Sequence, residues 1–216
     1  MTTRPPGPPP ARVAPQAMFS AMALGLAIAT ILFQPLDAAA ATAPRLLPDR
    51  DVKVEYTVTA PGRAPQAYDL SFSAESKRLR IDDPARGLWF LVDLRDASAV
   101  IVVPQMHVVV SEPDLSNLAV ILHRAETARF TPLGEATIAG LRCTRYLVSS
   151  QQVSGKACLT RGGIALEVSG EDSRGSAEAI ADQVVEAPVP PESLVPPPGF
   201  PSLALPPGTI AALLGQ

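Results

Sequence analysis

The stretch Asp51–Thr59, DVKVEYTVT, alternates polar and apolar side chains without interruption. In an extended chain the apolar members would all lie on one side, and they are Val52, Val54, Tyr56 and Val58. A period of two sustained over this length indicates a β-strand with one buried face, which is typical of antiparallel sheets. The domain is therefore predicted to begin with a strand.

The segments that follow have a similar texture. AYDLSFSA (67–74) and KRLRID (77–82) repeat the alternation, and turns rich in Gly, Pro and Asp separate them. LWFLVD (88–93) and SAVIVVPQMHVVV (98–110) are too apolar to leave one face in water. Short strands recurring at roughly 8–12 residue intervals indicate a mainly β domain.

Two segments depart from this pattern. SEPDLSNLAVILHRAE (111–126) places its leucines and Ile121 on one face of a helix, so we expect a helix over Leu115–Ala125 that packs on the sheet, with Ser111 or Asp114 as its cap. SAEAIADQVVEA (176–187) is ambiguous, because its Ala and Glu content favours a helix while its end runs extended into proline.

Strand texture returns in ARFTPLGEATIAGLRCTRYLVSS (128–150), with bends at Gly134 and Gly140. KACLTRGGIALEVSGE (156–171) predicts a hairpin, because Gly162 and Gly163 can take the positive φ of a tight turn.

Nine of the 24 prolines lie between Pro188 and Pro207. This segment must be extended and cannot be a central strand, since proline lacks the N–H that a sheet requires. Leu194 and Phe200 are the side chains that could anchor it on the sheet.

The N-terminus has the layout of a cleavable secretory signal. Arg4 and Arg12 precede an apolar run from Met18 to Phe33, and small residues end at Ala40 or Ala41, where we expect cleavage. An uncleaved anchor is the rival, but a spanning helix wants about 20 apolar residues. We therefore expect a periplasmic or secreted protein without a stable membrane anchor.

The two cysteines, Cys143 and Cys158, raise the question of a redox pair, a metal site or a disulfide. In an exported chain the disulfide is the default. Both lie in strand-like segments joined by a polar connection, so neighbouring antiparallel strands could bring them together. A redox pair is normally closer in sequence and has a lowered thiol pKa.

No constellation for catalysis stands out. His107 and His123 have no nucleophile within a known motif, and four Cys or His ligands at zinc spacing are lacking. The acids near turns, Asp82, Asp83, Asp93 and Asp96, are expected to be solvated loop residues. The net charge of −3 argues against nucleic acid as a partner. We expect a protein that is not an enzyme and has no cofactor or metal.

Three segments, GEATIAGLRCTRYLV, KACLTRGGIALEVSG and PESLVPPPGF, together resemble a family of uncharacterised exported bacterial proteins with the fold of LolA-type lipoprotein carriers. The resemblance implies a single curved antiparallel sheet, an incomplete β-barrel, with one or two helices on its concave face. It also implies that Gly134, Gly140, Gly162, Gly163 and Gly199 are turn residues, that Tyr146 is a strand residue, and that Pro198 and Phe200 help to close the barrel.

Carriers of this type usually have an arginine in the concave site. Arg78, Arg80, Arg142 and Arg145 lie on predicted strands, and their facing is open at this point. The expected organisation is a signal peptide (1–41), a linker (42–50), the LolA-like domain with its Pro-rich closing segment (51–201) and a tail (202–216).

The expected function follows from this organisation. The leading hypothesis is a periplasmic protein whose half-barrel binds an apolar ligand, such as a lipid or the acyl chain of a lipoprotein. The alternative is a structural or interaction protein of the cell envelope that docks a partner protein through its Pro-rich segment.

Overall fold

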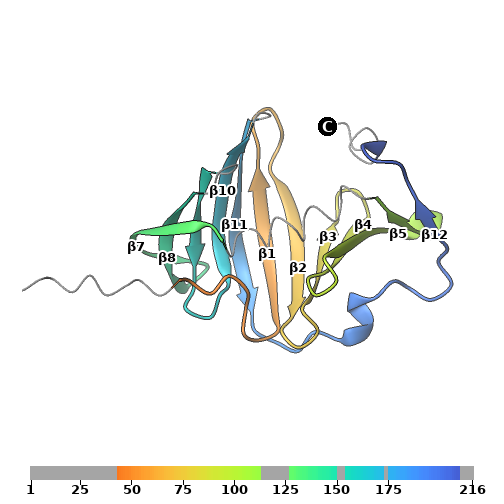
Figure 1. Cartoon of the computed structure of the whole chain (residues 1–216), viewed down its shortest axis with the longest axis horizontal. Helices are drawn as coiled ribbons and strands as arrows, with labels where there is room; N and C mark the ends of the chain where they lie inside the picture. Colours follow the sequence, from red (N-terminus) through yellow and green to blue (C-terminus); the bar gives the residue numbers. More distant parts are fainter. Residues whose placement is uncertain (1–42, 113–126, 150–153, 173–174, 210–216) are drawn as a thin grey trace, which may run out of the picture. The chain divides into compact units, whose positions relative to one another are not determined.

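The computed structural model describes residues 43–112, 127–149, 154–172 and 175–209 (Figure 1). These residues belong to one compact unit, which spans 42–216. The helix expected over Leu115–Ala125 and the cleavage site expected at Ala40 or Ala41 lie outside the described residues.

The described residues form one open sheet of twelve strands in the order β12-β6-β5-β4-β3-β2-β1-β11-β10-β9-β8-β7 (Figure 1). Neighbouring strands are antiparallel, except that β12 runs parallel to β6. The strands are β1 (Val52–Thr59), β2 (Gln66–Ser73), β3 (Arg78–Asp83), β4 (Leu88–Asp93), β5 (Ser98–Val103), β6 (Val108–Ser111), β7 (Arg129–Ile138), β8 (Leu141–Ser149), β9 (Ser154–Leu159), β10 (Ala165–Asp172), β11 (Gly175–Val185) and β12 (Ser202–Ala204). The sheet does not close into a barrel, so the predicted mainly β fold with an incomplete barrel is confirmed.

Strand β1 lies in the middle of the sheet, between β2 and β11. Val52 and Val54 are buried, while Lys53 and Glu55 are exposed, as the alternation in DVKVEYTVT predicts. The ambiguous segment 176–187 supplies most of β11, because pairing with β1 and β10 on both sides outweighs its helix propensity.

The main core is a row of apolar side chains that runs across neighbouring strands. Val52 pairs with Phe72, Phe72 with Leu79, and Leu79 with Val92. These side chains are 1–6% exposed, and Leu166 of β10 joins the same cluster. The face of β1–β4 that carries them, called the core face below, is covered.

Tyr56 brings a polar group to the edge of this core. Its hydroxyl donates a hydrogen bond to the carbonyl oxygen of Ala165, at 2.6 Å. Burial raises the pKa of Tyr56 to about 12, because the interior disfavours the phenolate. The stability that this neutral phenol contributes is complete below its ordinary pKa of 10 and is lost as the pH rises from there through 12.

The opposite face of β4–β6 is also buried, which explains why those segments are so apolar. Leu91, Val102 and Val109 form a second cluster there, and Phe200 of the Pro-rich segment packs against it. The segment reaches this face from β11 through the 3₁₀ helix η3 (Pro191–Leu194) and ends in β12 at the edge of the sheet (Figure 1). The Pro-rich segment is therefore peripheral, as predicted, and it is extended except at η3, where the prediction of a fully extended segment is wrong.

Val189 and Leu194 fix the beginning of that segment, because both are only 4% exposed. The Asp51 carboxylate adds a polar attachment. It accepts hydrogen bonds from the backbone N–H of Val189, at 2.9 Å, and from that of Ala74, at 2.8 Å. The Pro-rich segment thus belongs to the packed domain.

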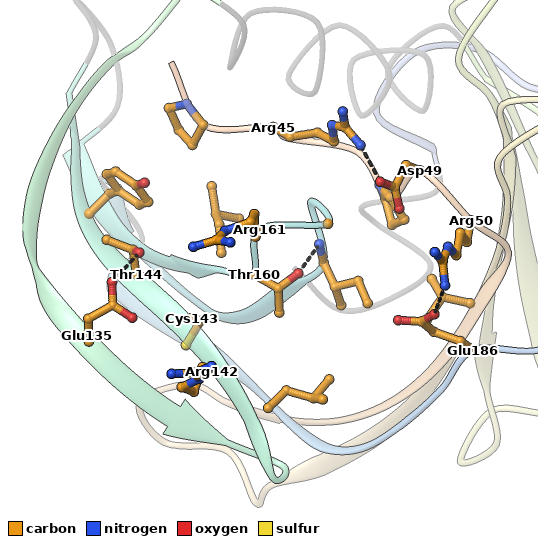
Figure 2. Close-up of a pocket in the computed structure, with 18 of the residues that line it drawn as sticks. Arg45, Asp49, Arg50, Glu135, Arg142, Cys143, Thr144, Thr160, Arg161 and Glu186 are labelled. Carbon is orange, nitrogen blue, oxygen red and sulfur yellow. Dashed lines mark hydrogen bonds and ion pairs between the residues drawn. The ribbon is translucent and has the colours of Figure 1, made fainter. Parts of the chain in front are cut away.

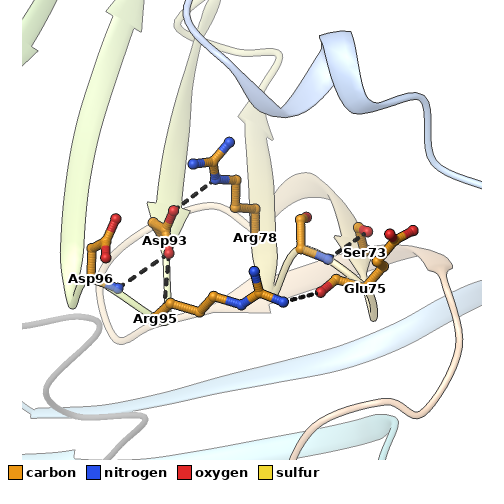
Figure 3. A network of polar contacts seen from close by, with 7 residues as sticks. Ser73, Glu75, Arg78, Asp93, Arg95 and Asp96 are labelled. Carbon is orange, nitrogen blue, oxygen red and sulfur yellow. Dashed lines mark hydrogen bonds and ion pairs between the residues drawn. The ribbon is translucent and has the colours of Figure 1, made fainter.

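The expectation that the acids near turns are merely solvated is wrong for Asp83 and Asp93. Asp83 is 3% exposed and pairs with Arg86. Asp93 accepts hydrogen bonds from the Arg78 side chain and from the backbone N–H groups of Arg95 and Asp96 (Figure 3). Burial alone would raise the pKa of Asp93, but these hydrogen bonds outweigh it and hold the pKa below its ordinary value.

The apolar run 98–110 is not one continuous strand. A 3₁₀ turn, η1 (Pro104–Met106), interrupts the apolar run, and His107 ends it with φ 53° in the left-handed region. The proline cannot continue the sheet ladder, so the run becomes a hairpin between β5 and β6. The exposed His107 ring lies 5.3 Å from that of Phe200.

Candidate ligand-binding cavity

A cavity of about 720 Å³ lies at the β7–β10 end of the sheet, where the strands curve around it (Figure 2). Its walls come from β8, from the turn between β9 and β10, from the start of β1 and from residues 43–50, called the N-terminal segment below. Apolar side chains, among them Leu141, Leu159 and Ile164, alternate in this wall with arginines and acids.

The N-terminal segment is held against the β9–β10 turn. The backbone N–H of Asp49 donates to the carbonyl oxygen of Gly162, at 3.2 Å, and Leu47 packs against the main core. Gly163 takes φ +87°, and a Cβ placed on it would lie 2.3 Å from the carbonyl oxygen of Leu47. A glycine is needed here for two separate reasons, its φ and the close approach of the backbone.

We expect Gly163→Ala to loosen this contact and to destabilise the domain by more than its φ alone requires. Gly140→Ala is the matched control, because Gly140 has φ +75° and open space around it. An alanine in the left-handed region costs roughly 1–2 kcal/mol in both variants, and the overlap with Leu47 should add about 1–2 kcal/mol to Gly163→Ala. Equal urea midpoints for the two variants would show that the segment yields without cost.

The cavity contains more positive than negative side chains. Arg45 pairs with Asp49. Arg50 pairs with Glu186, at 3.3 Å. The third acid in the wall, Glu135, accepts a hydrogen bond from the hydroxyl of Thr144, at 2.9 Å.

Two further arginines in the wall, Arg142 and Arg161, are exposed, and their side chains make no hydrogen bond or ion pair with any of the described residues. Figure 2 shows Arg161 within the opening and Arg142 on the strand below it.

Three of the four strand arginines form ion pairs and do not line the cavity. Arg78 pairs with Asp93, and Arg145 pairs with Glu167, at 3.0 Å.

Arg80 pairs with Asp82 and lies 4.1 Å above the ring of Trp89. Among the four strand arginines, Arg142 is the one that lines the cavity. Sequence reasoning missed Arg161, although its place beside the two turn glycines was a usable signal, since a tight turn projects the neighbouring side chain.

A second cavity, of about 530 Å³, lies along the same N-terminal segment. Its wall includes Leu46, Leu47 and Phe130, and Pro44 and Pro48 border both cavities. The ring of Phe130 meets that of Tyr146, which lines the first cavity, edge-on at 5.8 Å. The two cavities are therefore adjacent, and the second one is mainly apolar, although Arg45, Asp49 and Lys77 also line it.

Cys143 and Cys158 form a disulfide that joins β8 and β9, as the sequence predicts. Cys143 also lies in the wall of the first cavity.

The remaining residues singled out in the sequence lie in turns and bulges. Gly134 has φ +136° at a bulge in β7, Gly140 has φ +75° in the β7–β8 turn, and Gly199 has φ +80° just before Phe200. Gly162 stands beside Gly163 in the β9–β10 turn.

No protein-family model and no curated protein sequence matches this chain. Solved structures do. An uncharacterized conserved protein from Thermus thermophilus is 10% identical, with a TM-score of 0.52 over 73% of this chain and 91% of that chain. This likeness shows a shared fold.

Two other matches have lower TM-scores. A LolA superfamily protein from Nitrosomonas europaea is 9% identical, with a TM-score of 0.32 over 70% of this chain and 92% of that chain. The MucA/MucB complex of Pseudomonas aeruginosa contains a chain that is 15% identical, with a TM-score of 0.46 over 68% of this chain. This protein spans 55% of the length of that chain. A LolA superfamily protein is thus among the solved structures that match this chain, in line with the sequence resemblance.

The described part of the chain contains no helix with the length and hydropathy that crossing a membrane requires.

Proposed function

We propose that this protein is an exported binding protein without catalytic activity, which holds an amphiphilic ligand such as a lipid or the acylated end of a lipoprotein. The observation that carries the proposal is the pair of adjacent cavities along the N-terminal segment, one rich in arginine and the other mainly apolar. Their volumes fall within the range of small-molecule sites, which is about 300–1,000 Å³. A ligand with a polar head and an apolar chain matches both.

The place of the apolar chain differs from the one that the sequence suggested. The core face of the sheet is filled, since Val52, Phe72 and Val92 are 1–2% exposed. An acyl chain therefore has its room beside Leu46 and Phe130, in the second cavity. Burial of a chain there is favoured by about 0.8 kcal/mol for each CH₂ group removed from water.

The packing of the Pro-rich segment favours this function over the alternative, in which that segment docks a partner protein. Val189 and Leu194 are buried within the domain, and Phe200 packs on β4–β6. Three of the apolar side chains of this segment are therefore already used inside the fold, which leaves Val195 and Leu203 as its exposed large apolar residues among those described.

Export is supported by two independent features. The N-terminal 41 residues have the layout of a secretory signal. The disulfide between Cys143 and Cys158 suits an oxidising compartment such as the periplasm.

The test is extraction of the protein purified from the cell envelope with organic solvent, followed by mass spectrometry. We expect a bound lipid, and a rise in thermal stability when lipid is added back. Leu46→Gln should abolish both, because it places an amide in the apolar cavity. Leu133→Gln is the control, since Leu133 is 55% exposed on β7. A clean extract together with no thermal response to fatty acids or phospholipids would contradict the proposal.

A further inference from the structure

We infer that Arg142, Arg161 and Tyr146 form a subsite for anionic oxygens, so that the ligand carries a phosphate or carboxylate head. This inference rests on the proposed function and names the chemistry of the head group that the first cavity takes. It is carried by the polar groups of the cavity wall that have no partner among the described residues.

The charges of the side chains that line the first cavity do not cancel. Asp49 is paired with Arg45, and Glu186 with Arg50. Glu135 is the one acid of the wall outside these pairs, and it shares the wall with the two remaining arginines. The cavity thus has one surplus positive charge, whereas the whole chain has a net charge of −3. A concave site of one sign attracts the opposite charge.

Some hydrogen-bonding groups of this wall have a partner within the described residues, and others do not. The hydroxyl of Thr160 already accepts the backbone N–H of Ile164, at 3.0 Å, and Glu135 already accepts a hydrogen bond from Thr144. Arg142 and Arg161 are pure donors, and the hydroxyl of Tyr146 has no partner among the described residues. A group that offers acceptor oxygens and negative charge complements these donors.

The backbone that carries the two arginines is tied to neighbouring segments. Arg142 lies on β8, which the disulfide ties to β9. Arg161 lies in the β9–β10 turn, where the carbonyl oxygen of the following Gly162 accepts a hydrogen bond from the backbone N–H of Asp49 in the N-terminal segment. Both arginines therefore start from fixed backbone, which reduces the entropy that a bidentate contact with an oxyanion would cost.

The two cavities meet at a pair of aromatic rings. Tyr146 lines the first cavity and Phe130 the second, and their rings are in contact. A ligand whose oxyanion lies at Arg142 and Arg161 can therefore direct its apolar chain past this pair of rings. The geometry points to an anionic amphiphile in preference to a neutral one.

The experiment is calorimetric titration of the mature protein with three probes below their micellar concentrations: dihexanoyl phosphatidic acid, octanoate and dihexanoyl phosphatidylcholine. We expect the two anionic probes to bind more tightly than the zwitterionic one, and to bind more weakly as salt is raised. The tighter of the two anionic probes identifies the head as phosphate or carboxylate. Arg142→Gln and Arg161→Gln should each weaken anionic binding about tenfold.

Arg63→Gln is the control for charge, since Arg63 is exposed in the β1–β2 turn and lines neither cavity. It should change affinity by less than about twofold, as expected for a screened surface charge. Thermal melts of each variant verify that the fold is intact. Equal binding of all three probes, unchanged in the arginine variants, would overturn the inference and leave the proposed function standing. Failure of every probe to bind would count against both.

Discussion

A chain that ends at Ala187 is expected not to fold. Truncation there removes two side chains that are 4% exposed, Val189 and Leu194, and also Phe200 with its contact to the second cluster. Each such side chain contributes about 1.5–3 kcal/mol when it is fully buried. Their sum is comparable with the whole stability of a typical domain, about 5–15 kcal/mol. The circular dichroism spectrum of the truncated protein should lack the cooperative thermal transition of the intact chain.

Two point variants test the same idea where the truncated chain gives no protein. Leu194→Ala should lower the free energy of unfolding by about 2–5 kcal/mol. Leu203→Ala, in the same segment but 47% exposed, should lower it by less than about 1 kcal/mol. Urea denaturation measures both. A truncated protein with the stability of the intact chain would mean that the Pro-rich segment is free to serve a partner.

Loss of the disulfide is the second large effect that we expect. Cys143 and Cys158 are 15 residues apart, and closing a loop of this size stabilises the fold by roughly 3 kcal/mol in the chain-entropy model. Both cysteines are almost completely buried, so Cys143→Ala/Cys158→Ala also loses some packing. The double variant should therefore unfold at a clearly lower urea concentration than the oxidised protein.

Reducing agent provides the control for this prediction. It should shift the unfolding midpoint of the wild-type protein toward that of the double variant, and it should leave the double variant unchanged. A wild-type midpoint that is insensitive to complete reduction, verified by thiol counting, would show that β8 and β9 are held by their hydrogen bonds alone.

The arginines show how far a candidate site can be predicted from sequence. Alternation correctly assigns Arg78, Arg80, Arg142 and Arg145 to strands, but it cannot say which of them lines a cavity. Three strand pairs, β1–β11, β7–β8 and β9–β10, contain a shift of register. Each extra residue reverses the facing of the side chains beyond it, so local alternation does not extend through the sheet.

The turn arginine illustrates a different limit. Arg161 lines the cavity because the β9–β10 turn meets the N-terminal segment, which lies more than a hundred residues earlier in the chain. Nothing in the neighbourhood of RGG encodes that contact. The two glycines indicate a tight turn, but the close approach at Gly163 exists only once Leu47 has packed on the core.

The sequence by itself determined the features that depend on neighbouring residues: the strand at Asp51–Thr59, the hairpin at Gly162 and Gly163, and the extended course of the Pro-rich segment. These follow from side-chain alternation, the φ preferences of glycine and the missing N–H of proline. The tertiary structure alone decided that residues 176–187 form a strand, that Phe200 packs on β4–β6, and that Arg142 and Arg161 share a cavity. Each of these depends on contacts between segments far apart in the chain, whose free energy outweighs local preference and leaves no local pattern.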